Sequence, residues 1–86
     1  MIIMSLELIT WLKDGKYRIR ILKLLRNNIM IPSEIAEKLS LNRASISRIL
    51  RQLKEKNLVK STSAGSRTIS YEISKLGIEV LNNEEK

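Results

Sequence analysis

The chain has 86 residues, of which 16 are Lys or Arg and 9 are Asp or Glu, so its net charge is +7. It contains no Cys and no His, which excludes disulfides, zinc fingers, imidazole metal sites, thiol catalysis and Ser-His catalysis. This length predicts a single small domain spanning residues 1–86, with a modest core built from Ile and Leu because Phe is absent. We therefore predict that the protein is not an enzyme and needs no cofactor.

The chain opens on the apolar stretch MIIMSLELITWL, which is predicted to be helical from about Ser5 to Lys13. The stretch contains Glu7, is shorter than the roughly 17 residues that span a bilayer, and lacks the basic start of a signal peptide. We expect a cytoplasmic protein without membrane contact. The segment has more apolar side chains than one helix face needs, so residues 1–15 are predicted to supply a homodimer contact, with Trp11 in the core or in that contact.

After the break at Asp14-Gly15, a second helix is predicted over residues 16–27, and the apolar run 29–31 is predicted to form a short strand. Pro32 suits the first turn of a third helix that reaches Leu39. A three-residue turn, 40–42, then leads into a fourth helix over about 43–56.

The fourth helix is amphipathic. At about 100° per residue, one side is apolar and consists of Ile46, Ile49, Leu50 and Leu53. The opposite side carries Ala44, Arg48, Arg51 and Glu55, with Ser45, Ser47 and Gln52 on the flanks. Asn42 is placed as its N-cap and Asn57 as the left-handed residue after its end.

The excess charge is concentrated around this helix. Between residues 38 and 67 eight cations face one acid, Glu55, whereas the rest of the chain has eight cations and eight acids. Charge blocks of this kind are typical of surfaces that bind nucleic acid or anionic membranes. A membrane-bound helix would need its apolar side for lipid, but here a globular core needs that side, so nucleic acid is favoured.

Beyond the fourth helix the apolar period changes from helical to two, over residues 58–62 and 68–73, with the small polar tip 63–67 between them. This pattern predicts a β-hairpin over 58–73. Ser74 is placed to cap a last short helix that ends near residue 82.

The element order resembles the winged helix-turn-helix regulators, and in particular the small MarR-like and ArsR-like proteins of archaea and bacteria. The stretches IPSEIAEKLSLNRASISRILRQLKEKNLV and YEISKLG carry this resemblance, which covers residues 16–81. It implies a mostly α fold with a small β-hairpin wing (α+β), a helix-turn-helix at 32–56, a wing at 58–73 and a C-terminal helix at 74–82. Ala36 supplies the small residue where the two helices cross, whereas Ser40 and Asn57 stand where the family often has Gly.

The resemblance implies a transcriptional regulator that binds double-stranded DNA sequence-specifically, with helix 43–56 in the major groove and the wing at the minor groove or backbone. Arg48 is the first candidate for reading a base, because a guanidinium can bind both groove acceptors of guanine. Phosphate contacts are expected from Arg51, Lys54 and Lys60, and from Ser33 at the start of the preceding helix. The full set of candidate DNA-binding residues is Ser33, Arg43, Ala44, Ser45, Ser47, Arg48, Arg51, Gln52, Lys54, Lys60, Ser66 and Arg67.

Two alternatives share the same residues. One is an architectural protein that binds DNA without sequence preference, and the other is a winged helix whose basic face binds an acidic protein. Single-strand or RNA binding is less favoured, because the chain has no aromatic side chain within its charged block. The sequence leaves open the operator, the direction of regulation and any small-molecule effector.

Overall fold

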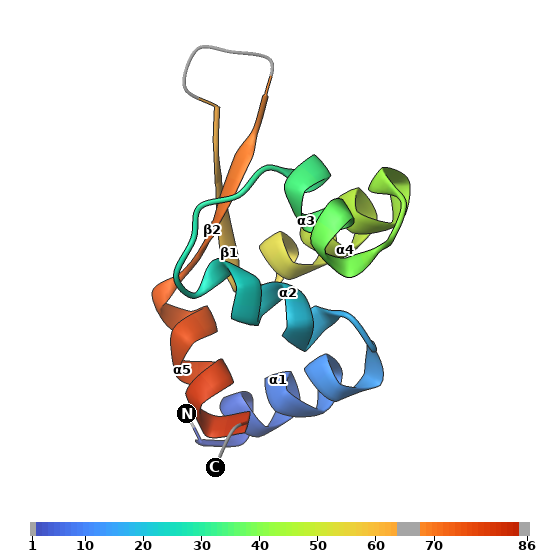
Figure 1. The fold of residues 1–86 in the computed structure, drawn as a ribbon. Coiled ribbons are helices and arrows are strands. Elements are labelled where there is room, and N and C mark those ends of the chain that lie inside the picture. Colours follow the sequence, from blue (N-terminus) through green and yellow to red (C-terminus); the bar gives the residue numbers. More distant parts are fainter. Residues whose placement is uncertain (1, 64–67, 85–86) are drawn as a thin grey trace.

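The computed structural model describes residues 2–63 and 68–84. Within them the helices are α1 (Ile2–Asp14), α2 (Arg18–Leu25), α3 (Pro32–Leu39), α4 (Arg43–Glu55) and α5 (Lys75–Glu84). Strands β1 (Val59–Thr62) and β2 (Ser70–Ile73) form one antiparallel hairpin (Figure 1). The predicted class, mostly α with a small β-hairpin, is confirmed. No helix among the described residues is both long and apolar enough to cross a membrane.

The hairpin projects from one end of a helical body, and α1 packs against α5 at the other end (Figure 1). Helix α2 lies between them, where it contacts α1, α5 and β2. Helices α3 and α4 pack together on one side, and α4 leads directly into β1. The hairpin and the α3–α4 pair therefore share one half of the molecule, and α1 and α5 share the other.

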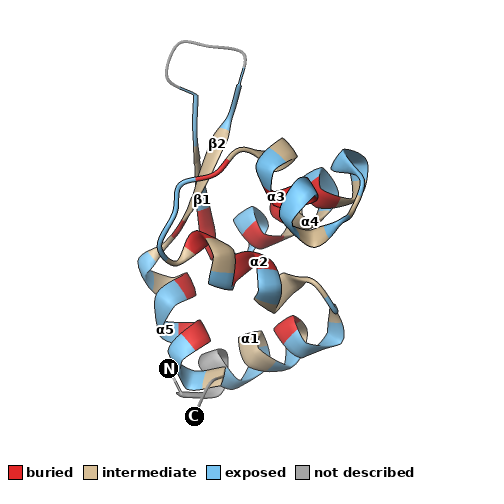
Figure 2. Ribbon diagram, in the orientation of Figure 1, coloured by how far each residue is buried: buried red, intermediate tan, exposed pale blue. Residues whose placement is uncertain are grey.

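One apolar core joins these elements. Each helix turns buried residues inward, as the red segments of Figure 2 show. The side chains with no solvent exposure are Leu12, Ile21, Leu22, Ile35, Ile46, Leu50, Leu53, Leu58, Val80 and Leu81. Fully burying one such side chain is worth about 1.5–3 kcal/mol, so this core is the main source of stability for a small domain.

Two of the predicted helices differ in length from the structure. Helix α1 begins at Ile2, earlier than the expected Ser5, because the apolar run continues back to the start of the chain. Helix α5 continues to Glu84, past the residues that the sequence pattern covered. Helix ends are the least reliable part of any periodicity argument, since the last turn has no apolar residue to mark it.

The strand predicted over 29–31 is wrong. Only Met30 pairs, in an isolated bridge to Tyr71 in which each backbone N–H donates to the other residue's carbonyl, at 3.0 and 2.8 Å. Pro32 has no N–H and already opens α3, so the segment cannot extend the ladder beyond Met30.

The ends of α4 are defined by local hydrogen bonds. The Asn42 side chain accepts a bond from the Ser45 backbone N–H at 2.8 Å, which confirms the predicted N-cap. Ser40 (φ 56°) and Asn57 (φ 63°) are left-handed, at the two positions where Gly is frequent in the family. After Asn57, the Leu58 N–H donates to the Leu53 carbonyl at 3.0 Å and turns the chain into β1.

The start of α5 closes against the same corner. The Ser74 hydroxyl accepts a bond from the Gly77 N–H at 3.0 Å, as predicted for a cap, and donates to the Asn57 carbonyl at 2.7 Å. A Cβ on Gly77 would lie 2.3 Å from the Leu58 carbonyl oxygen, so only glycine allows α5 to approach β1 this closely. The base of the hairpin is thereby fixed to the helical body.

Candidate nucleic-acid interface

Helix α4 divides its residues between the core and solvent. Ile46, Leu50 and Leu53 have no solvent exposure, which holds the opposite side of the helix outward. The exposed candidates on α4 are Arg43, Ala44, Ser47, Arg48, Arg51 and Lys54. Ser45 and Gln52 are half-buried at the flanks, so they offer less surface to a partner than the other candidates.

This exposed surface is basic and has small side chains near its N-terminal end. Ala44 and Ser47 leave the first turns open to close approach, and the longer Arg48 and Arg51 follow. Among the described residues of α4 the only acid is Glu55, the last residue of the helix. The arrangement suits insertion into the groove of a polyanion, because cations at graded depth can reach both bases and phosphates.

A hollow of about 440 Å³ separates the first turns of α3 and α4 from the hairpin. Three candidate residues from two helices line it together: Ser33, Arg43 and Ser47. The hairpin side is formed by Thr68, Ile69 and Tyr71. The structure thus gathers residues from three separate stretches of the chain around one concave surface that a strand of DNA backbone would fit.

Tyr71 belongs to this surface and was missed by the sequence argument, which treated it only as part of a strand. Its place is set by the bridge to Met30, which draws β2 against the segment that leads into α3. The available signal was the apolar run 29–31 before Pro32, since such a run must pair or pack somewhere. A tyrosine hydroxyl at this position can donate to a phosphate oxygen.

The N-terminus of α3 presents Ser33 beside an acid. Pro32 is the first residue of the helix, and the Glu34 carboxylate accepts a bond from the Ile31 N–H at 3.1 Å. Ser33 is half-buried, and its hydroxyl is the polar side-chain group that α3 contributes to the hollow. The exposed Glu34 lowers the attraction of this helix end for an anion.

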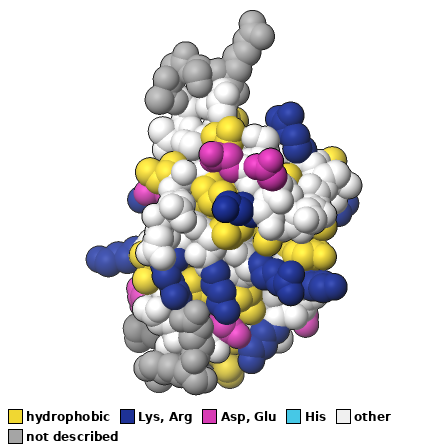
Figure 3. All heavy atoms as spheres, in the orientation of Figure 1, with side chains coloured by type: hydrophobic (Ala, Val, Ile, Leu, Met, Phe, Trp, Pro, Cys, Tyr) yellow, Lys and Arg dark blue, Asp and Glu magenta, His cyan; other side chains and the backbone are white. Residues whose placement is uncertain are grey.

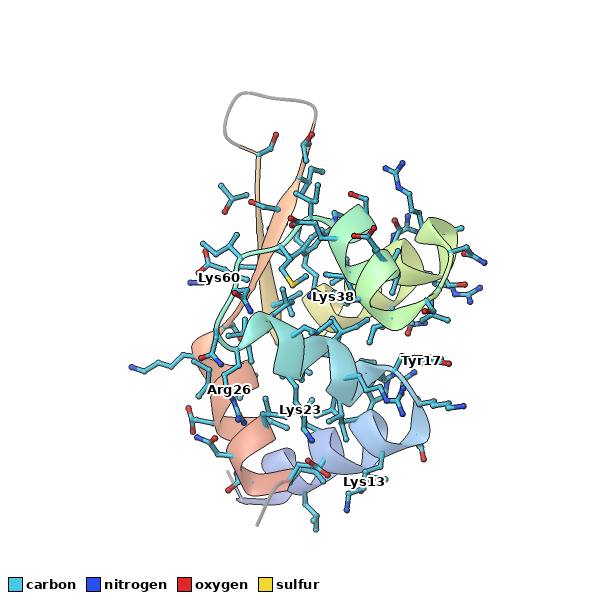
Figure 4. All side chains as sticks on the ribbon, in the orientation of Figure 1. Lys13, Tyr17, Lys23, Arg26, Lys38 and Lys60 are labelled. Carbon is cyan, nitrogen blue, oxygen red and sulfur yellow. The ribbon has the colours of Figure 1, made fainter. Side chains whose placement is uncertain are left out.

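The wing candidates are divided by the strand alternation. Lys60 is exposed and lies opposite Glu72 in the register, whereas Tyr71, opposite Ser61, points to the other side of the hairpin. Figure 4 labels Lys60 on the side of the hairpin away from α3 and α4. The structure therefore does not bring Lys60 to the hollow, and Ser66 and Arg67 lie outside the described residues.

Comparison with known proteins supports a regulator. The family model described as "Bacterial regulatory protein, arsR family" matches residues 15–61, which include α2, α3 and α4. No curated protein sequence matches the chain. The matched family consists of regulatory proteins, which confirms the prediction of a regulator rather than an enzyme.

Solved structures share the fold. ZitR of Lactococcus lactis, solved in complex with DNA, has 27% identity and a TM-score of 0.71 over 79% of this chain and 48% of its own. Reduced HlyU of Vibrio cholerae has 23% identity and a TM-score of 0.78 over 94% of this chain and 82% of its own. AdcR of Streptococcus pyogenes, an adhesin competence repressor, has 16% identity and a TM-score of 0.76 over 83% and 55%. The chain spans about half the length of ZitR.

ZitR is described as a zinc-responsive MarR family member. The residues of the present chain do not fit such a site, because it has no Cys and no His. In the part of the chain that the structure describes, no three or more Asp and Glu side chains gather into a group able to hold a metal ion. We assign no role to a metal.

Proposed function

This chain belongs to the arsR family of bacterial regulatory proteins, and we propose that it is a sequence-specific regulator of transcription that binds double-stranded DNA. In this proposal α4 enters the major groove, and the hairpin lies against the neighbouring backbone or minor groove. The observation that carries it is the basic outer side of α4, which adjoins the hollow lined by Ser33, Arg43 and Ser47. The existence of a ZitR–DNA complex with a similar fold supports it.

The contacts are assigned by chemistry. Arg48 reads a base, because it is exposed beyond the first turn of α4 and its guanidinium can form two bonds to guanine. Ala44 faces a thymine methyl, and Ser45, Ser47 and Gln52 contact base edges where the groove brings them within reach. Phosphates are held by Ser33, Arg43, Arg51 and Lys54. Lys60, Ser66 and Arg67 are assigned to the wing's contact with backbone or minor groove.

The first test is equilibrium binding to random-sequence and selected duplexes over a salt series. We expect log affinity to fall linearly with log salt, with a slope of about −0.9 per phosphate contacted. A selected operator should bind roughly 10³-fold or more tightly than random DNA. Equal affinity for both would favour the architectural alternative. No binding at low salt would leave the winged helix as a protein-binding module.

Arg48→Ala tests base reading. We expect it to relax the preference at one base pair of the selected operator by about 1–3 kcal/mol, because the two guanine acceptors lose their donor. Lys54→Ala should instead weaken all sequences alike and make the salt slope shallower by about 0.9. Lys75→Ala is the control, since it removes one exposed charge from α5, on the other side of the molecule from α4 (Figure 1). A uniform loss with Arg48→Ala would assign that residue to a phosphate.

We further propose that two copies pair through α1. Leu6 on this helix is 63% exposed, although α1 is the most apolar stretch of the chain, and α1 packs only its inner side against α2 and α5. Two-fold pairing would place two copies of α4 on half-sites about one DNA turn apart. Dimer formation by this small domain would also bury apolar surface that its own core leaves exposed.

Leu6→Glu tests this pairing by light-scattering mass at several protein concentrations. We expect the native chain to be a dimer and the variant a monomer, because a charge would be buried in the contact. Ile29→Glu is the matched control, since Ile29 is 66% exposed in the loop before α3. A native chain that is monomeric at all concentrations, or a loss of pairing by both variants, would contradict the assignment to α1.

A further inference from the structure

A second basic region lies outside the charge block 38–67. Residues 13–26 contain six cations and a single acid, Asp14. The remainder of the chain outside 38–67 is neutral only because the acids lie on other segments, such as Glu34 and Glu37 of α3. The charges of this remainder are therefore separated by element, although their sum is zero. Figure 3 shows the Lys and Arg side chains gathered over the region of α1 and α2.

The corner between α1 and α2 is built to sort its cations. The Arg18 guanidinium turns inward, donates to the Trp11 carbonyl, and lies 3.9 Å from the centre of the Trp11 ring. Gly15 makes this possible, because a Cβ there would lie 2.3 Å from Arg18 Nε. With Arg18 held inside, Lys16 and Arg20 remain exposed at the surface of the corner.

Lys16 and Arg20 converge on one aromatic ring. The Lys16 Nζ and the Arg20 Cζ each lie 5.6 Å from the centre of the Tyr17 ring. Like charges four residues apart destabilise an isolated helix by a few tenths of a kcal/mol, so the pair has a cost in the folded protein. Within the described part of the chain neither cation forms an ion pair, so the crowding is not offset internally. A bound anion would offset it.

The corner lies in line with the proposed DNA surface. The hairpin projects at one end of the molecule and the α1–α2 corner lies toward the other, with α3 and α4 between them (Figure 1). Figure 4 labels Tyr17 at this corner, on the side where α3 and α4 lie. The longest dimension of the fold is 38 Å, slightly more than one turn of DNA, which is about 34 Å. A duplex that follows the hairpin and α4 continues toward the corner.

We propose that Lys16, Tyr17 and Arg20 form a second phosphate-binding surface, which holds the DNA backbone on the side of α4 away from the wing. The inference rests on the proposed function, and it adds residues from outside the helix-turn-helix and wing. The partner is the sugar–phosphate backbone rather than a base, because the cations stand on a helix end and no groove-entering element accompanies them. The tyrosine hydroxyl adds a donor between two cations.

The test combines protein variants with neutralised phosphates. Operator duplexes carrying a single uncharged methylphosphonate at successive positions are titrated with the native chain and with Lys16→Ala/Arg20→Ala. We expect the double variant to make the salt slope shallower by about 1.8 per bound chain, because each of the two cations accounts for about 0.9. At the phosphates beside the corner, neutralisation should weaken the native chain and leave the variant unaffected, whereas effects elsewhere should add.

Two further variants fix the interpretation. Lys75→Ala, which removes an exposed charge from α5, should show additive effects at every phosphate. The double variant should keep the base preference of the native chain, unlike Arg48→Ala. Additive effects of the double variant at all positions would overturn the second surface while leaving the proposed function intact. Absence of DNA binding by the native chain would overturn the proposed function itself.

Discussion

Helices α4 and α1 are each 13 residues long, yet they meet the core in opposite ways. In α4 the apolar residues form one stripe that packs into the core, and the remaining side is polar and basic. In α1 the apolar residues extend around the helix, and those described range from Leu12, which is fully buried, to Leu6, which is 63% exposed. A helix whose apolar surface matches its core presents a polar face to a polar partner, whereas one with apolar surface to spare needs a second apolar surface.

The largest expected effect separates the two helices by stability. Leu50→Ala in α4 should lower the free energy of unfolding by about 2–5 kcal/mol, because it leaves a cavity in place of a fully buried side chain. Leu6→Ala in α1 should change it by less than about 0.5 kcal/mol at low protein concentration, where the chain is monomeric. Urea denaturation followed by circular dichroism measures both values.

Raising the protein concentration sharpens this contrast. If two copies pair through α1, the native chain should become more stable with concentration, because only the folded state associates. Leu6→Ala should reduce that gain. A large loss of stability in Leu6→Ala at every concentration would mean that Leu6 belongs to the core of the single chain.

An intermediate effect is expected at the start of α4. Asn42→Ala removes the side-chain oxygen that accepts from the Ser45 N–H, and should cost about 1 kcal/mol of stability. Asn42→Asp should retain the bond and most of the stability. Thermal unfolding of the two variants gives the comparison, and an equal loss in both would indicate that the cap is not the source of the effect.

The smallest effect concerns the left-handed residues on either side of α4. Ser40→Gly should raise stability by a few tenths of a kcal/mol, since the left-handed conformation strains a serine by up to about 1–2 kcal/mol while glycine loses more entropy on folding. Asn57→Gly should gain less, because Asn tolerates this conformation. The midpoints of chemical denaturation test the order, and a loss of stability in Ser40→Gly would contradict it.

The features of α4 were predictable because their causes are local. The buried stripe of Ile46, Leu50 and Leu53 follows from the helical period, and the Asn42 cap follows from a side chain three residues before its donor. The candidate residues Arg43, Ala44, Ser47, Arg48 and Arg51 are all exposed for the same reason.

The sequence alone also determined the hairpin, its last helix and the family, because the alternation, the turn residues and the Ser74 cap are contained in short stretches. Only the tertiary structure decided how distant segments meet. The Met30–Tyr71 bridge, the hollow that joins Ser33 to the hairpin, and the separation of Lys60 from it all depend on packing between elements. Periodicity gives which side of an element is apolar, but not which neighbour covers it, so the surface shared by α3, α4 and the hairpin emerged only when the core was assembled.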